Sequence, residues 1–350
     1  MTRVARTAHL GLGAFARAHQ AWYTEVADPD WGIAAYPTRS RRVVDALAAQ
    51  DFRYGLLVRG PSTDVATVIS SVVAVGDPSF FESPELAVVT LTVSEAGYLS
   101  GAAPLQQLAS LLRVRRDSGA GALALVPCDN VPSNGSVLRD GLRGLAPDLA
   151  PWISDNVSFV STMVDRITPA TTPADVAIAE SLLGWRDAVP VVTEPFTEWV
   201  LQGSFPAGRP AWEKAGAQFV DDVEPYEQRK LWMLNAAHSL LAYRGLALGL
   251  ATVNEAWHAL SPEVEQLWSE AREVLSLDAA EVDDWLAALR IRWENPRIEH
   301  RLEQIAQGGE QKIPARIGAV ISRRAEFGLP AGAAELETIA AWERYRKAHS

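Results

Sequence analysis

Short apolar runs alternate with amphipathic stretches through the first half of the chain. Apolar runs of this kind, rich in Val, Ile and Leu and bounded by turn-forming residues, are typical of β-strands. The predicted strands are Ala8–Leu10, Gly32–Ala35, Tyr54–Arg59, Ser70–Val75, Val88–Val93, Ala122–Pro127, Ser158–Val164 and Val189–Thr193, and the predicted helices among them are Leu105–Arg115 and Ser136–Leu145. Strands that alternate with helices indicate an α/β fold built on a parallel sheet.

The pattern changes after Phe205, where apolar residues recur with the period of a helix. The predicted helices are Tyr226–Ala247, Val264–Leu275, Ala279–Ile291, Pro296–Gln307 and Ala333–Lys347. Pro225 stands near the start of the first of these helices and Gly249 just past its end, as expected for helix boundaries. A boundary within Pro206–Pro210 therefore separates an α/β domain, residues 1–210, from a mostly helical domain, residues 211–350.

Length and charge agree with two domains and a small-molecule function. A chain of 350 residues with 48% hydrophobic residues is too long for one ordinary core. The net charge of −11 and the isoelectric point near 5.1 argue against nucleic acid or an anionic membrane surface as the main partner.

Cysteine content and the lengths of the apolar runs narrow the class of protein further. Cys128 is the one cysteine, so no intrachain disulfide forms, and the six histidines provide no zinc-ligand cluster. The N-terminal residues contain no long apolar stretch, and the longest apolar run, Ser239–Val253, is interrupted by Arg244. We therefore expect a metal-free, cytoplasmic protein, and a monomer because the sequence shows no coiled-coil seam.

A glycine-rich loop follows the first predicted strand. Ala8-His-Leu-Gly11-Leu-Gly13-Ala-Phe-Ala16 fits the pattern G-x-G-x-x-A. Gly11 permits a tight turn, and Gly13 lets the backbone approach a pyrophosphate at the start of a helix. The loop predicts a Rossmann-type NAD(P) site in which Gly11, Gly13 and Phe15 bind the cofactor.

The residues after the second strand bear on the choice between NAD and NADP. An acidic residue at this place would bind the ribose 2′-hydroxyl of NAD. Trp31-Gly-Ile-Ala-Ala35 is instead followed by Arg39, Arg41 and Arg42, with no acid. Arginine suits a 2′-phosphate through a forked, charge-assisted contact, which favours NADP at least as well as NAD. Alternatively, these arginines form the solvated start of a helix.

Lys230, Asn235 and His238 lie in an otherwise apolar helical stretch. At roughly 100° per residue, α-helical geometry places all three within an arc of about 140°. An apolar environment lowers the pKa of a lysine, which can then act as a general base near neutral pH. In the alternative, structural interpretation, Lys230 extends to solvent and His238 is a buried residue with satisfied hydrogen bonds.

Two further polar segments follow predicted strands. Asn130 lies in Cys128-Asp-Asn130, between a strand and a helix, at the edge where an open α/β sheet binds ligands. Asp165 and Arg166 lie at the end of another predicted strand. Each segment taken alone is also compatible with a turn or an ordinary ion pair.

Together these segments resemble the polyol-specific long-chain dehydrogenases, the family of mannitol 2-dehydrogenase and fructuronate reductase. The resemblance extends over nearly the whole chain, through Gly11–Gln20, Trp31–Ile33, Val89–Tyr98, Cys128–Asn130, Met163–Ile167, Thr193–Phe196, Lys230–His238, Asn295–Pro296 and Lys312–Pro314. Its most specific features are the Met-Val-Asp-Arg-Ile segment and the spacing Lys-x4-Asn-x2-His.

This resemblance implies metal-free hydride transfer between a secondary alcohol and a nicotinamide. Lys230 is then the general base, and Asn130 and Asn235 hold the substrate oxygen as an oxyanion hole. His238 positions the substrate, and Asn130 also adjoins the cofactor. The residues expected to border the substrate are Val164, Asp165 and Arg292.

The nearest substrate class is a polyol of the mannitol and fructose type. A close alternative is a sugar acid of the mannonate and fructuronate type, whose carboxylate would need a cation such as Arg292 or Lys312. A dinucleotide-binding protein without chemistry is less favoured, because both Lys230 and Asn235 are present. The missing Cys and His cluster argues against a zinc alcohol dehydrogenase.

Overall fold

The structure, a computed structural model, describes residues 3–38, 40–99 and 101–349. The chain divides into two compact units, residues 1–223 and 224–350. The first is an α/β unit and the second is helical, which confirms the predicted fold class. Residues 211–223, placed in the helical domain by the sequence pattern, form η4 (Trp212–Ala215) and β12 (Gln218–Phe219) of the α/β unit.

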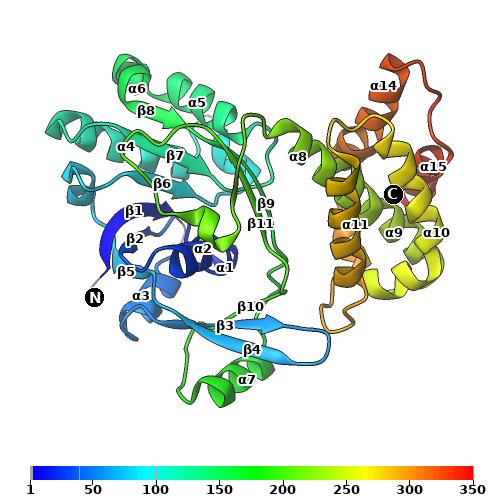
Figure 1. Cartoon of the computed structure of the whole chain (residues 1–350), viewed down its shortest axis with the longest axis horizontal. Helices are drawn as coiled ribbons and strands as arrows, with labels where there is room; N and C mark the ends of the chain where they lie inside the picture. The colour runs from blue at the N-terminus through cyan, green and yellow to red at the C-terminus, as the bar shows by residue number, and fades with distance from the viewer. Residues whose placement is uncertain (1–2, 39, 100, 350) are drawn as a thin grey trace. The chain divides into compact units, whose positions relative to one another are not determined.

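A six-stranded parallel sheet forms the centre of the α/β unit (Figure 1). In spatial order its strands are β5 (Val72–Val75), β2 (Trp31–Tyr36), β1 (Val4–Leu10), β6 (Val88–Leu91), β7 (Leu123–Pro127) and β8 (Val157–Phe159). The strand β1 thus lies between β2 on one side and β6 on the other. Successive strands of the chain are added first on one side of β1, as β2 and β5, and then on the other side, as β6, β7 and β8. Open α/β sheets bind ligands at the point where the strand order switches in this way.

Helices cover both faces of this sheet because side chains alternate along each strand. Ala34 and Tyr36 of β2 pack into one apolar cluster, while Ile33 and Ala35 of the same strand pack into another. The first cluster includes side chains of α4 (Ala103–Ser118), α5 (Asn134–Leu145) and α6 (Ala150–Asn156), and the second includes side chains of α1 (Ala14–Ala18), α2 (Gln20–Ala27) and α3 (Arg42–Ala48).

Some of the predicted strands lie outside the parallel sheet. β3 (Tyr54–Arg59) is parallel to β10 (Val191–Thr193) but antiparallel to β4 (Asp64–Ile69) in a separate sheet. The predicted strand Ser158–Val164 divides into β8 and β9 (Ser161–Asp165), and β9 pairs antiparallel with β11 (Glu198–Gln202). The prediction of one parallel sheet is wrong for these strands, because apolar runs reveal neither partner nor direction. Helix α7 (Pro173–Leu183) was not predicted.

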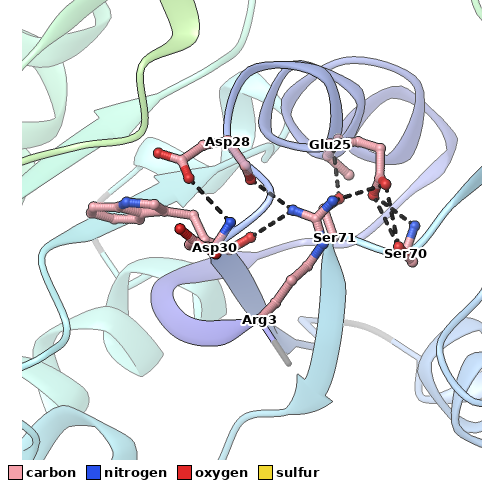
Figure 2. A network of polar contacts seen from close by, with 8 residues as sticks. Arg3, Glu25, Asp28, Asp30, Ser70 and Ser71 are labelled. Atoms are coloured by element: carbon pink, nitrogen blue, oxygen red, sulfur yellow. Dashed lines mark hydrogen bonds and ion pairs between the residues drawn. The ribbon is translucent and has the colours of Figure 1, made fainter. Parts of the chain in front are cut away.

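Arg3 connects the start of the sheet to α2 and to the turn between β4 and β5 (Figure 2). Its guanidinium donates to the carbonyl oxygens of Asp28 at 2.7 Å and Trp31 at 3.0 Å. It also pairs with the carboxylate of Glu25 at 2.8 Å, and that carboxylate accepts the N–H of Ser70 at 2.8 Å. These contacts fasten the edge of the sheet near β5 to α2.

The second unit is built from helices packed around α9 and α10 (Figure 1). In chain order they are α8 (Glu224–Arg229), η5 (Lys230–Asn235), α9 (Ala236–Ala247), α10 (Val253–Arg272), α11 (Ala279–Trp293), α12 (Leu302–Ala306), α13 (Gly309–Ile313), η6 (Pro314–Gly318), α14 (Ala319–Glu326) and α15 (Ala333–Ala348). Within the described parts of the chain, none of the helices has the length and apolar character to cross a membrane.

The helix predicted at Val264–Leu275 begins earlier than expected. Thr252 and Glu255 form a capping box that starts α10 at Val253. Pro262 lies inside this helix, where the sequence pattern indicates a break. Packing of the long apolar face of α10 therefore outweighs the local cost of the proline.

The helix predicted at Pro296–Gln307 is helical only over its last part, α12. The side chain of Asn295 accepts the N–H of Arg297 at 3.0 Å, and its carbonyl accepts the N–H of Ile298. This Asx turn directs the chain away from a helix directly after α11. The turn directly follows the end of α11, which carries Arg292.

Candidate active site

The glycine loop leads directly from β1 into α1. Gly11 has a φ of +92°, and a Cβ at this position would lie 2.3 Å from the carbonyl oxygen of Thr92. The N–H of Gly13 donates to the Gly11 carbonyl at 2.7 Å, and the N–H of Gly11 donates to the Tyr36 carbonyl at 3.0 Å. The result is a tight turn without side chains at the carboxyl end of β1, which fits the pyrophosphate of a dinucleotide.

A cavity of about 340 Å³ beside this turn brings several predicted site residues together. Its lining includes Gly11, Gly13, Phe15, Asn130 and Val164. These residues come from the ends of different strands, so the topology of the sheet gathers them. Asp165, which follows Val164 on β9, is also buried, but it is outside the set of residues that line this cavity.

A second cavity, of about 530 Å³, shares the glycine turn and extends to the residues after β2. Thr38 lines it, and among its described lining residues there is no acidic side chain. Arg41 and Arg42 are exposed, and Arg41 forms an ion pair with Asp45 at 3.2 Å. Arg39 lies outside the described residues.

The loop that carries Asn130 is fixed on both sides. The carboxylate of Asp129 accepts the N–H of Val131 at 3.1 Å and also accepts the hydroxyl of Tyr98. Burial and the nearby charge of Asp129 raise the pKa of Tyr98 above its usual range, so the hydroxyl remains a donor. The amide nitrogen of Asn134 donates to backbone carbonyls of β7 and β9, at 3.2 and 3.1 Å. Asn134 is therefore a structural residue.

Lys230 and Asn235 begin and end a π-helical segment, η5, between α8 and α9. The sequence predicts ordinary α-helix here, and that prediction is wrong for this segment. In a π-helix hydrogen bonds join residues five apart, which is the separation of Lys230 and Asn235. The buried residues Trp232 and Met233 anchor the segment in the core. Segments of this kind often occur at functional sites.

His238 is buried in α9 against Trp293, whose indole N–H donates to its Nε2 at 3.2 Å. The ring of His300 lies 4.8 Å away, centroid to centroid. Burial lowers the pKa of His238 well below its usual range, and the further causes are the positive charges of His300, Arg316, Arg292 and Lys230. His238 is therefore neutral near pH 7, with its proton on Nδ1 because Nε2 accepts.

Arg316 contacts the predicted site residue Asn235, and the sequence does not reveal this contact. It lies in a second π-helical segment, η6, and donates to the carbonyl of Asn235 at 3.0 Å and to the hydroxyl of Ser239 at 3.1 Å. Burial lowers the pKa of Arg316 to about 10, so the guanidinium stays charged near pH 7. The nearest signal in the sequence is the family segment Lys312–Pro314, which ends just before it.

Arg292 and Lys312, the cations that could bind a substrate carboxylate, differ in their surroundings. Arg292, near the end of α11, is buried and close enough to His238 to lower its pKa. Lys312 donates to the carbonyl of Ile305 at 3.1 Å, and burial together with the charge of Arg316 lowers its pKa. The helical unit thus brings the predicted residues Lys230, Asn235, His238 and Arg292 into one cluster. Among the described residues, no group of three or more His, Cys, Asp or Glu side chains is arranged to hold a metal ion.

Two family models match the chain. The mannitol dehydrogenase Rossmann domain matches residues 5–214, and the mannitol dehydrogenase C-terminal domain matches residues 222–350.

Individual relatives agree with these models. The D-mannonate oxidoreductase of Escherichia coli (strain K12) is 36% identical over 89% of this chain and 74% of its own length. The mannitol 2-dehydrogenase of Cereibacter sphaeroides is 32% identical over 96% of this chain and 80% of its own. The solved ternary complex of Pseudomonas fluorescens mannitol 2-dehydrogenase with NAD and D-mannitol matches with a TM-score of 0.82 at 32% identity, covering 98% of this chain and 79% of that one. The resemblance predicted from the motifs is confirmed, and the chain belongs to the mannitol dehydrogenase family of oxidoreductases.

Proposed function

We propose that the protein is a metal-independent, NAD(P)-dependent oxidoreductase that acts on a secondary CH–OH group of a polyol of the mannitol and fructose type. The observation that carries this proposal is that Lys230 and Asn235 begin and end one π-helical segment, and that the charge of Lys230 helps to lower the pKa of the buried His238. Relatives named mannitol 2-dehydrogenase and D-mannonate oxidoreductase support the substrate class.

Oxidation of an alcohol needs a base that takes the hydroxyl proton as hydride leaves the carbon. We assign that role to Lys230. The amides of Asn130 and Asn235 stabilise the negative charge that builds on the substrate oxygen. A nicotinamide bound at the glycine turn would supply the hydride acceptor. His238, whose Nε2 is occupied by Trp293, offers its Nδ1–H to orient a substrate hydroxyl.

Val164, Asp165 and Arg292 are proposed to border the substrate. Val164 lines the same cavity as Asn130 and the glycine turn, so it can exclude water beside the reacting carbon. Asp165 is buried at the end of the same strand, opposite Glu198 of β11. Arg292 contributes positive charge next to His238.

A sugar acid of the mannonate and fructuronate type is the second candidate substrate. The observation in its favour is that one lysine and two arginines, Lys230, Arg292 and Arg316, lie near enough to His238 for their charges to lower its pKa. A substrate carboxylate would form charge-assisted hydrogen bonds with such a group. The 36% identity to a D-mannonate oxidoreductase supports the same substrate class.

A substrate panel tests the proposed function. Nicotinamide absorbance is followed with mannitol, sorbitol, arabinitol, mannonate and altronate, each with NAD and with NADP. We expect turnover with a polyol; a preference for the two acids would favour the second candidate. In that case Arg292→Met is expected to raise KM for the acids by about tenfold or more, while KM for polyols changes little. No turnover with either class would contradict both proposals.

We further propose that NADP is used at least as well as NAD. The cavity after β2 presents Thr38 and no acid among its described lining residues, and positions 39, 41 and 42 are arginines. We expect kcat/KM for NADP to equal or exceed that for NAD. Arg39→Ala or Arg42→Ala is expected to lower kcat/KM for NADP by about tenfold with little effect on NAD. Arg143→Ala, on the exposed side of α5, is the control. A strong NAD preference in the wild type would contradict this prediction.

A further inference from the structure

His9 is buried in β1, directly opposite Thr90 of the neighbouring strand β6. Its Nδ1 lies 2.7 Å from the hydroxyl oxygen of Thr90, and its Nε2 lies 3.0 Å from the hydroxyl oxygen of Thr92. Thr92 lines both cavities at the glycine turn, whereas His9 and Thr90 are outside both sets of lining residues. His9 therefore acts on a bound ligand through the groups that it contacts, the hydroxyl of Thr92 and the backbone of Gly11.

The direction of these hydrogen bonds follows from the protons available. Thr92 has one hydroxyl proton and donates it to the carbonyl of Gly11 at 2.6 Å, so its oxygen accepts from the Nε2–H of His9. Burial lowers the pKa of His9 to about 4, so near pH 7 the ring is neutral and carries this one proton. Nδ1 then accepts the hydroxyl of Thr90, for which the carbonyl of Ala8 is a more distant acceptor at 3.5 Å.

The carbonyl of Gly11 is the end of this chain of hydrogen bonds. It accepts both the hydroxyl of Thr92 and, at 2.7 Å, the N–H of Gly13. The backbone of Gly11 also lies so close to Thr92 that a Cβ would not fit between them. The orientation of this peptide sets the direction of the neighbouring N–H groups, which are the groups that a pyrophosphate meets.

We propose that His9 is a positioning residue for the dinucleotide. Its ring joins the hydroxyl of Thr90 to that of Thr92, which in turn donates to the Gly11 carbonyl, and these contacts fix the glycine turn in its binding shape. This inference rests on the proposed binding of NAD(P) at the turn. A turn without this support is less ordered before binding, and the cost of ordering it reduces affinity. His9 touches no reacting group, so its contribution lies in nucleotide binding.

The test is the dissociation constant of NADH and of NADPH, measured by fluorescence titration of the full chain. Thr90→Val and Thr92→Val each keep the shape of the side chain and remove one hydroxyl. Thr92→Val is expected to weaken nucleotide binding by about tenfold, and Thr90→Val by about threefold because it frees only the far end of the chain. Thr92→Ser keeps the hydroxyl and is expected to bind within about twofold of the wild type.

Thr7→Val is the matched control. Thr7 lies on the same strand as His9, is equally buried, and its hydroxyl has no hydrogen-bond partner among the described residues. This variant is expected to keep wild-type nucleotide affinity. Thermal unfolding and KM for the alcohol substrate are recorded for every variant, because a purely structural role would change the melting temperature and leave nucleotide affinity intact.

The outcomes separate the proposed role of His9 from the proposed binding of NAD(P) at the glycine turn. Wild-type affinity in both Thr90→Val and Thr92→Val, or a Thr92→Ser variant as weak as Thr92→Val, would overturn the role of His9 and leave the proposed function standing. A wild-type protein that binds neither nucleotide would overturn both. If Thr92→Val does not fold, Thr90→Val decides the question alone, because it is outside both cavities.

Discussion

Replacing Lys230 by alanine is expected to lower kcat/KM for alcohol oxidation by about 10³-fold, which is within the range of general-base catalysis. The variant removes the amine that we propose takes the hydroxyl proton. Dissociation constants for NADH and NADPH are expected to stay unchanged, because we propose that the nucleotide binds at the glycine turn and that Lys230 acts on the substrate hydroxyl. Steady-state kinetics and fluorescence titration measure the two quantities separately.

Lys230→Arg distinguishes the base from its charge. Arginine keeps a positive charge but does not lose its proton near neutral pH, so kcat is expected to remain as low as in the alanine variant. Lys214→Ala, at an exposed position of η4, is the matched control and is expected to behave like the wild type. Wild-type turnover in Lys230→Ala would show that another group accepts the proton and would remove the main support for the mechanism.

The strands of the parallel sheet could be predicted because both faces of that sheet are covered. β2 and β7 are buried along their whole length, so they appear in the sequence as unbroken apolar runs. β4 shows the opposite case. It is an edge strand with several exposed positions, and its sequence Asp64–Ile69 gives no such run. Its pairing with β3 depends on contacts that local sequence does not contain.

The π-helical segment at Lys230 could not be predicted for a related reason. The stretch from Leu231 to Leu241 is apolar nearly throughout, so the hydrophobic pattern has no clear period that would separate a wider turn from an α-helix. The spacing of Lys230, Asn235 and His238 indicates a shared site in either geometry. Only the structure shows that the first two begin and end one π-helical segment.

His9 and Arg316 illustrate what sequence alone leaves hidden. His9 lies in a predicted strand among apolar residues, and its partners Thr90 and Thr92 are distant in the chain. Arg316 is one arginine among many until the fold brings it to the carbonyl of Asn235. His9 contacts Thr92, and Arg316 contacts the carbonyl of Asn235. In both cases the partner is far away in the sequence. Residues of this kind lack the local patterns that reveal a glycine turn.

Asn130→Ala and Asn235→Ala are each expected to lower kcat by about 10²–10³-fold, the usual effect of losing one oxyanion donor. KM is expected to change much less, because the negative charge on oxygen develops only as the proton leaves. Asn130 lines the cavity at the glycine turn, and Asn235 ends the segment that Lys230 begins. Values of kcat and KM for the best substrate of the panel measure the effect.

Two further asparagines provide controls. Asn156→Ala, at the end of α6, removes an amide that donates to the carbonyl of Trp152 at 3.0 Å, and it is expected to leave kcat unchanged. Asn134→Ala removes the amide that joins β7 to β9 and is expected to lower the melting temperature. A fall in kcat without a fall in melting temperature therefore separates the oxyanion role from a structural one.

Asn235 allows a sharper test because its backbone and side chain have separate roles. Its carbonyl accepts Arg316, so alanine at this position removes the side-chain amide and leaves that contact in place. If both amides serve one oxygen, the double variant is expected to lose little more than the more severe single variant, since such residues act as a unit. Unchanged kcat with a raised KM in both single variants would contradict the proposal. The amides would then bind the alcohol and its transition state equally, and other donors would have to meet the charge on oxygen.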